Sequence, residues 1–410
     1  MMRQILIAGA GASGMMAAIH AARAGARVTL LERKDRPGKK LLSTGNGRCN
    51  LTNMDQREEY YRCDQAGFPS QVLGRFPVMD TLEFFEGLGI LAKSRNGYIY
   101  PNSDQALSVL EALLGELKVL DVKIICQTPV TRAGKKGDTF FVYSGDRKFQ
   151  GQALILAAGS RAAPVTGSDG SGYELASGFG HRLITPLPAL VQLRCGEKHY
   201  KRLAGVRTEA RVSLYGNGKF LASDQGELQL TDYGISGIPT FQVSRYASVA
   251  LHRKQEVKAR IHFLPQMDEG QVRDMLDRRR RHMKAGNCLQ FMNGLLNSKL
   301  SAVLLNLAGI REDQPVTSVT KAGWDQLFTQ LTNYETQITA ANSFDHAQVC
   351  RGGVDTRQVR ENTLESRLVP GLYFCGELLD VDGICGGYNL QWAWSSGAVA
   401  GQNAAKGDRP

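Results

Sequence analysis

The first residues that could do chemistry are three glycines near the N-terminus. An apolar run, residues 4–8, ends in the sequence GAGASG at residues 9–14, and an alanine-rich stretch follows up to Gly25. Glycines at this spacing permit a sharp turn, let the backbone approach a pyrophosphate and let a helix pack closely on a sheet. The free N–H groups at the start of such a helix face the phosphates. The pattern therefore predicts a strand, a turn and a helix that bind a dinucleotide.

An acidic residue stands where such a site needs one. Residues 27–31 form a second apolar run, and Glu32 follows directly after it. Its carboxylate can accept hydrogen bonds from the hydroxyl groups of the adenosine ribose. It is improbable that a strand, a GxGxxG turn, a helix, a second strand and an acidic residue occur in this order by chance. The motif alone does not distinguish FAD from NAD.

The polar loop after Glu32 favours FAD. The loop comprises residues 33–53 and ends in the stretch GNGRCNLTN at 45–53, in which Leu51 is the single apolar anchor. A loop rich in Lys, Ser, Asn and Thr can wrap the FAD pyrophosphate and place donors along the isoalloxazine. A plain NAD domain would continue into another helix here. The alternative interpretation is an ordinary surface loop.

The C-terminal region gives a second signal for a flavin. Residues 369–377 (VPGLYFCGE) predict a turn, a short buried strand and a Gly-Glu exit, and residues 383–391 (GICGGYNLQ) open a helix with small residues at its packing positions. Glycines let the backbone come close to a flavin, and the helix N-terminus directs partial positive charge at it. The sequence predicts a site built from both ends of the chain.

The remaining segments predict the elements that must position these residues. Helices are expected at 78–88 and 106–117, and strands at 122–126 and 153–157. Residues 190–265 alternate as strands, with turns at 216–218 and at Gly226. Residues 267–342 are expected to be mostly helical. The expected class is α/β.

Composition narrows the class of protein. The 410 residues carry eight cysteines without a CxxC pair, which indicates reduced cytosolic thiols and no metal site. No apolar run is long enough for a membrane span, and glycines interrupt the N-terminal run that resembles a signal peptide. We expect a cytoplasmic protein with a small-molecule substrate.

The net charge of +11 raises the question of nucleic acid. The densest basic run, residues 277–284 (DRRRRHMK), contains no interleaved aromatic residue. A solvated helix face is therefore the preferred interpretation, and nucleic acid is not the expected partner. An RNA-binding flavoprotein is kept as an alternative.

Together these motifs resemble the BaiN/YhiN-like family of FAD-dependent oxidoreductases, which includes aminoacetone-oxidase-like flavoproteins. The resemblance covers essentially the whole chain and is carried by residues 9–14, 45–53, 230–237 (LTDYGISG), 350–354 (CRGGV) and 363–397. The sequence departs from the family pattern at residues 157–160, where AAGS replaces ATGG, and at Arg351.

The resemblance implies a Rossmann-type FAD-binding domain of glutathione-reductase-like topology, interrupted by a β-rich subdomain and a small helical subdomain. The expected boundaries are 1–189 and 343–410 for the split FAD-binding domain, 190–266 for the barrel-like β-rich subdomain and 267–342 for the helical insert. FAD is expected to be held non-covalently by residues from several distant segments. They are Gly9, Ala10, Gly11, Ala12, Ser13, Gly14, Glu32, Arg33, Lys34, Lys40, Ser43, Gly47, Arg48, Cys49, Asn50, Thr52, Val130, Ala157, Ala158, Gly159, Gly376, Glu377, Asp380, Gly387, Tyr388, Asn389 and Leu390.

The resemblance implies reduction of a C=C bond conjugated to a ketone, as in a steroid or bile-acid intermediate, by hydride transfer from flavin N5. No second GxGxxG unit is found, so NAD(P)H, the expected electron donor, would dock transiently. The alternatives are an amine oxidase that uses oxygen and the RNA-modifying flavoprotein.

Such a reduction needs a proton donor opposite the flavin. Tyr388, Tyr233 and Ser236 are the candidates by placement, and packing or a structural hydrogen bond is an equal explanation for each tyrosine. Cys49 and Cys375 lie in the flavin motifs, as does Cys385, and all three are interpreted as buried, inert thiols.

Overall fold

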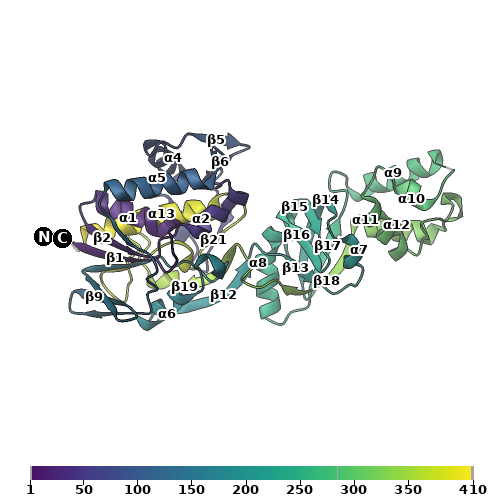
Figure 1. Ribbon diagram of the computed structural model, residues 1–410. Coiled ribbons are helices and arrows are strands. Elements are labelled where there is room, and N and C mark those ends of the chain that lie inside the picture. Colours follow the sequence, from purple (N-terminus) through teal and green to yellow (C-terminus); the bar gives the residue numbers. More distant parts are fainter. Residues whose placement is uncertain (1, 284, 408–410) are drawn as a thin grey trace. The chain divides into compact units, whose positions relative to one another are not determined.

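The structure is a computed structural model that describes residues 2–283 and 285–407, so Lys284 of the basic run lies outside the described residues. The chain divides into two compact units. Unit 1 comprises Met1–Leu187 and Gln348–Pro410, and unit 2 comprises Pro188–Ala347. Figure 1 shows the ribbon of both units with their helices and strands labelled.

Unit 1 is built on a parallel sheet with the strand order β20-β11-β1-β2-β7. Its strands are β1 (Gln4–Ala8), β2 (Arg27–Leu31), β7 (Lys123–Ile125), β11 (Ala153–Leu156) and β20 (Leu372–Phe374). All four pairings are parallel. The two ends of the chain thus share one sheet, and this confirms the predicted Rossmann-type α/β class.

Helices and small sheets surround this sheet. The helices of unit 1 are α1 (Ala12–Arg23), α2 (Lys39–Ser43), α3 (Phe68–Leu73), α4 (Val78–Gly87), α5 (Ala106–Val119), α6 (Ser171–Gly178) and α13 (Tyr388–Lys406). The short strands are β3 (Thr52–Asn53), β4 (Tyr61–Arg62), β5 (Ala92–Arg95), β6 (Tyr98–Pro101), β8 (Arg132–Lys136), β9 (Thr139–Ser144), β10 (Arg147–Gly151), β19 (Val349–Val354) and β21 (Asp382–Gly383). Strand β12 (Leu183–Ala189) begins in unit 1 and ends in unit 2. The expected helices at 78–88 and 106–117 are α4 and α5, so both are confirmed.

Helices α1 and α13 lie side by side in unit 1 (Figure 1). Small residues make this contact possible, because a Cβ at Gly397 would lie 2.5 Å from the backbone oxygen of Ser13, and one at Gly401 would lie 2.2 Å from that of Ala17. This packing holds the C-terminal helix against the helix of the GxGxxG motif.

Unit 2 contains a closed barrel with the strand order β13-β16-β15-β14-β17-β18. The strands are β13 (Leu193–Cys195), β14 (Arg207–Gly216), β15 (Lys219–Leu230), β16 (Gly234–Gly237), β17 (Val257–His262) and β18 (Tyr334–Ala341). The helices are α7 (Tyr200–Leu203), α8 (Ile238–His252), α9 (Glu269–His282), α10 (Cys288–Met292), α11 (Ser298–Leu307) and α12 (Lys321–Thr332). Buried aliphatic side chains from the strands, such as Val212 and Ile261, form its core together with residues of α9–α12.

Three details of unit 2 differ from the sequence-based expectation. Helix α8 lies within residues 190–265, the segment expected to alternate as strands. Gly226 is no turn, because it pairs with Ala210 inside the continuous strand β15. Strand β18 lies within the segment expected to be mostly helical, and its alternating burial fits a strand that closes the barrel. The turn at 216–218 is confirmed, since Gly216 pairs with Lys219.

Within the described residues, no helix is both long and apolar enough to cross a membrane.

Candidate functional site

The three glycines of the GxGxxG motif have three different surroundings. Gly9 has a φ of +106°, and a Cβ there would lie 2.4 Å from the backbone oxygen of Ala157. A Cβ at Gly14 would lie 1.9 Å from the backbone oxygen of Gly9. A Cβ at Gly11 meets no atom within 4 Å. Gly9 and Gly14 are therefore required by packing, whereas Gly11 leaves open space at the start of α1.

Glu32 ties the glycine loop to the segment after β2. Its side chain is buried, its Oε2 accepts a hydrogen bond from the backbone N–H of Ala10 (2.9 Å), and its Oε1 accepts one from that of Lys34 (2.8 Å). Each carboxylate oxygen retains a further lone pair. The geometry is compatible with additional acceptance from ribose hydroxyls.

A cluster of polar side chains joins three motifs that lie far apart in the sequence. The Lys40 ammonium lies 2.6 Å from Oε2 of Glu377, and the Ser160 hydroxyl donates to the same oxygen at 2.9 Å. Lys40 also donates to the backbone oxygen of Ala162. Ser160, one of the two residues that depart from the family's ATGG pattern, is not among the predicted site residues. Its hydroxyl could have been recognised as a partner only if Glu377 were known to lie beside it.

The loop at 45–53 is fixed from the C-terminal side. Asn50 is buried and, in the orientation of its amide that satisfies both ends, accepts from the backbone N–H of Gly387 (3.2 Å) and donates to the backbone oxygen of Thr52 (2.9 Å). The indole N–H of Trp394, on α13, donates to the backbone oxygen of Leu51 at 2.9 Å. Hydrogen bonds therefore hold the loop at 45–53 against the first residues of α13.

Helix α13 begins with two glycines in the left-handed region, Gly386 (φ +122°) and Gly387 (φ +94°), and no side chain caps its N-terminus. A Cβ at Gly387 would lie 2.6 Å from the backbone carbon of Thr52, so only glycine fits. The side-chain amide of Asn389 accepts a hydrogen bond from the backbone N–H of Gly383 and donates one to its backbone oxygen, so it is engaged within residues 383–389. Tyr388 packs edge-on against Tyr60 and Tyr61.

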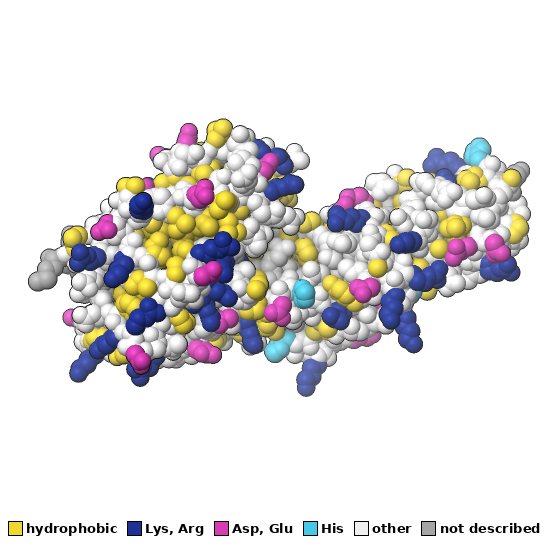
Figure 2. All heavy atoms as spheres, viewed as in Figure 1, with side chains coloured by type: hydrophobic (Ala, Val, Ile, Leu, Met, Phe, Trp, Pro, Cys, Tyr) yellow, Lys and Arg dark blue, Asp and Glu magenta, His cyan; other side chains and the backbone are white. Residues whose placement is uncertain are grey.

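These features fit FAD. Helices α1 and α13 both begin without a side-chain cap, and an uncapped N-terminus is a ready site for phosphate or another electron-rich group. The open space at Gly11 would accept a pyrophosphate. Figure 2 shows hydrophobic side chains gathered on one face of unit 1, over α13 and α2, next to a group of Lys and Arg side chains. An apolar face bordered by cations suits a molecule with an aromatic ring system and a pyrophosphate.

All of the predicted cofactor residues lie in unit 1, but the candidate proton donors are divided between the two units. Tyr388 lies in unit 1, and Tyr233 and Ser236 lie in unit 2. The Tyr233 hydroxyl is a hydrogen-bond partner of the Asn342 amide (3.1 Å), and Arg194 lies over its ring. Ser236 is buried, and its backbone oxygen accepts from Thr240. The Tyr233 hydroxyl therefore has a structural partner in unit 2, and Ser236 is buried there.

Two of the three thiols in the flavin motifs are buried as expected, whereas Cys385 is only half-buried. Cys49 and Cys375 are fully buried, and burial raises the pKa of each thiol to about 12. A thiol with such a pKa is protonated at neutral pH and a poor nucleophile. Their interpretation as inert packing residues is consistent with this burial.

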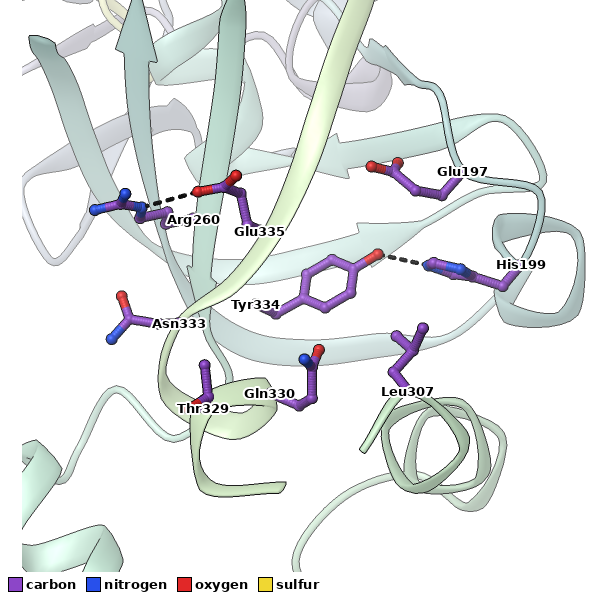
Figure 3. A pocket seen from close by; sticks show the side chains of 9 residues that line it. All are labelled: Glu197, His199, Arg260, Leu307, Thr329, Gln330, Asn333, Tyr334 and Glu335. Atoms are coloured by element: carbon purple, nitrogen blue, oxygen red, sulfur yellow. Dashed lines mark hydrogen bonds and ion pairs between the residues drawn. The ribbon is translucent and has the colours of Figure 1, made fainter. Parts of the chain in front are cut away.

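Unit 2 contains a separate polar cavity of about 530 Å³ at the barrel end, beside α11 and α12 (Figure 3). In it, His199 Nε2 and the Tyr334 hydroxyl lie 2.6 Å apart, and Arg260 donates to Glu335 at 3.3 Å. Glu197 accepts from the backbone N–H of Gln337. These side chains are hydrogen-bonded to one another or to the backbone.

Fold and site define a Rossmann-type flavoprotein oxidoreductase. A family model described as the HI0933-like protein Rossmann domain matches residues 3–403. The chain belongs to this family, and its predicted BaiN/YhiN-like character is confirmed. The family implies FAD as the cofactor.

Two relatives and one solved structure illustrate the similarity. The 3-dehydro-bile acid delta(4,6)-reductase of Clostridium scindens is 46% identical over 407 residues, which cover 99% of this chain and 100% of that protein. The ribosomal RNA dihydrouridine synthase of Escherichia coli is 28% identical over 402 residues, 97% of each chain. The 3-ketosteroid-delta4-(5alpha)-dehydrogenase of Rhodococcus jostii RHA1 aligns with a TM-score of 0.47 at 14% identity, covering 98% of this chain and 97% of that chain.

Proposed function

We propose that this chain is an FAD-dependent reductase of C=C bonds conjugated to a ketone, with steroid- or bile-acid-like enones as substrates and NAD(P)H as the electron donor. The observation that carries the proposal is the 46% identity to a bile-acid delta(4,6)-reductase over the full length of both chains. The overall reaction adds a hydride and a proton across the double bond while NAD(P)H is oxidised to NAD(P)⁺. Bound FAD supplies the hydride-transferring ring.

In this proposal the chain's own residues hold and orient the cofactor. The start of α1 and the open space at Gly11 receive the pyrophosphate, and Glu32 receives the adenosine ribose. The start of α13 and the loop at 45–53 lie along the isoalloxazine. The Lys40–Glu377 pair closes the site between them.

Tyr388 is the proton donor that the geometry favours among the three candidates. It stands at the first turn of α13, and burial raises its pKa to about 12, so it keeps its proton at neutral pH. We expect Tyr388→Phe to lower kcat by about 10²-fold, which is the lower range for general acid catalysis. FAD content should stay unchanged. Tyr61→Phe, in the ring that packs against Tyr388, is the matched control and should keep kcat within about 3-fold; equal kcat in all three proteins would remove Tyr388 from this role.

Dihydrouridine formation in RNA is the second candidate, because a relative at 28% identity has that activity in its name. The uracil C5=C6 bond is conjugated to the C4 carbonyl, so the chemistry is closely similar. The basic run gives this candidate limited support. Arg279 donates to the backbone oxygen of Phe291 (2.6 Å), and Arg280 lies over the ring of Trp324. Two of its arginines thus stabilise the helical part of unit 2 rather than stand free for phosphates.

One anaerobic experiment separates these candidates. The FAD-loaded protein is reduced with NADH or NADPH and mixed with a 3-keto steroid that has a conjugated double bond, with uridine-containing RNA, or with oxygen. We expect the enone to restore the absorbance of oxidised flavin and to gain two hydrogen atoms, as read by mass spectrometry. Restoration by RNA alone would favour the dihydrouridine candidate, and restoration by oxygen alone would favour the oxidase. Either result would overturn the proposal.

A further inference from the structure

The hairpin of β5 and β6 presents two tyrosines and two cations on one face. In the register of this antiparallel pair, Lys93 lies opposite Tyr100 and Arg95 lies opposite Tyr98. Alternate residues of a strand point to the same face, and so do residues directly opposite each other on neighbouring strands. These four side chains therefore share one face, whereas Ile99 points to the other face and is buried.

This tyrosine-bearing face lies against the segments assigned to the flavin. Strand β6 pairs with β3 at the end of the flavin loop, and a Cβ at Gly45 in that loop would lie 3.7 Å from Cε1 of Tyr100. A Cβ at Gly386 would lie 2.7 Å from Cε1 of Tyr98 and 3.2 Å from Cε2 of Tyr388. The ring of Tyr98 is 41% exposed. It therefore stands beside the start of α13 and is open to a ligand there.

The cations of the hairpin outnumber the acid that they contact. Lys93 and Arg95 both bind Oδ2 of Asp104, at 2.6 and 2.8 Å. The hydrogen bond from Lys93, and then the charges of Arg95 and Arg48, hold the pKa of Asp104 below its ordinary value against the effect of burial. Because Asp104 is ionised, these three cations and one carboxylate leave a surplus of two positive charges.

Arg95 keeps hydrogen-bond donors for a second carboxylate. Its Nη2 donates to Asp104, whereas a guanidinium carries five N–H donors in a fork that matches a carboxylate. The Arg95 side chain is 49% exposed, and its guanidinium carbon lies 5.9 Å from the centre of the Tyr100 ring. Figure 2 shows Lys and Arg side chains gathered over the β5–β6 hairpin. An anionic group that reaches this hairpin therefore meets accessible donors and uncompensated positive charge.

We propose that this face selects enones that carry a carboxylate, with the apolar rings of the substrate over Tyr98 and its carboxylate on Arg95. Lys93 and Arg48 add to the attraction. The proposal deepens the proposed function and rests on it for the class of substrate and for the place of reduction beside α13. The competing anion is NADPH, but it carries a pyrophosphate as well as a 2′-phosphate, for which this group has too few cations.

Equilibrium binding tests the proposal without turnover. A 3-keto-4-ene steroid with a side-chain carboxylate, and its methyl ester, are titrated into the oxidised, FAD-loaded protein, and binding is read from the flavin absorbance. We expect Arg95→Gln to weaken binding of the acid about tenfold, as for one lost charge-assisted hydrogen bond, and to leave the ester within about 2-fold. Arg95→Lys keeps the charge and should lose less. Arg147→Gln, at an exposed arginine of another hairpin in unit 1, is the matched control and should change neither probe.

Two further readouts separate charge from ring contact. Added salt should weaken binding of the acid alone, because it screens exposed charges. Tyr98→Ala should weaken both probes by the same factor, since its ring contacts the part that they share; a loss confined to the acid would contradict that contact.

The proposal is overturned if Arg95→Gln weakens both probes equally or neither of them. It is also overturned if that variant weakens binding of NADPH, relative to NADH, instead of the acid, which would assign the cations to the dinucleotide. Because binding is measured without reduction, a protein that binds the acid selectively through Arg95 but reduces no enone would contradict the proposed function and not this recognition surface.

Discussion

Gly11→Val is expected to abolish practical FAD binding while leaving the fold intact. The backbone of Gly11 is extended (φ −78°, ψ −172°), which valine adopts readily, and a Cβ there meets no protein atom within 4 Å. Its loss of stability should therefore be about 1 kcal/mol or less. A branched side chain would, however, occupy the space assigned to the pyrophosphate and block its hydrogen bonds with the start of α1.

Two lost charge-assisted hydrogen bonds at about 1.5–3 kcal/mol each would weaken FAD binding by roughly 10²–10⁴-fold. Isothermal titration with FAD, together with a thermal melt of the flavin-free protein, measures both quantities. Gly115→Ala is the matched control, since Gly115 also has no atom within 4 Å of a Cβ but lies in α5. Unchanged FAD affinity in Gly11→Val would place the pyrophosphate elsewhere.

Trp394→Ala is expected to cost about 3–5 kcal/mol of unfolding free energy. The indole is fully buried, packs edge-on against Phe85 with ring centroids 5.1 Å apart, and donates to the backbone oxygen of Leu51. Truncation leaves both a cavity and an unsatisfied carbonyl. Because Leu51 lies in the loop at 45–53, the same change should weaken FAD binding.

A second substitution separates the two causes. Trp394→Phe keeps much of the volume and loses the hydrogen bond, so it should cost about 1–3 kcal/mol. Denaturant unfolding of both variants measures the difference. Leu91→Ala, at a side chain that is 70% exposed, is a surface control that should stay within about 0.5 kcal/mol of the natural protein. A loss below about 1 kcal/mol in Trp394→Ala would contradict the role given to this indole.

The dinucleotide-binding unit could be predicted closely because its determinants are local. The apolar runs at 4–8 and 27–31 coincide with β1 and β2, and each glycine of GAGASG has a steric environment that matches its predicted part. A continuous apolar run indicates a buried parallel strand, and the glycines directly after it indicate the turn. Both signals come from residues that are close together in the sequence.

Helix α8 was missed because the strands around it dominate the pattern between residues 190 and 265. Pro239 at the start of the helix, followed by buried Val243, Ala247 and Ala250, was the available signal. Strand β18 was assigned to a helical region because its pairing partners, β13 and β17, lie far away in the sequence. Long-range pairing of this kind leaves no local trace beyond alternation.

In the candidate site, too, features that depend on nearby residues could be predicted, and contacts between distant residues could not. The family resemblance predicts both Lys40 and Glu377 at the cofactor site, but their ion pair and its partner Ser160 depend on tertiary contact.

The measurement that tests the account most directly is the flavin content of the purified protein. The absorbance spectrum and quantification of the released cofactor should show about one non-covalent FAD per chain, either as purified or after incubation with FAD, in line with a single GxGxxG unit. The bound flavin should be released on denaturation. A correctly folded protein that carries no flavin, and whose FAD titration shows no binding, would contradict the account at its centre.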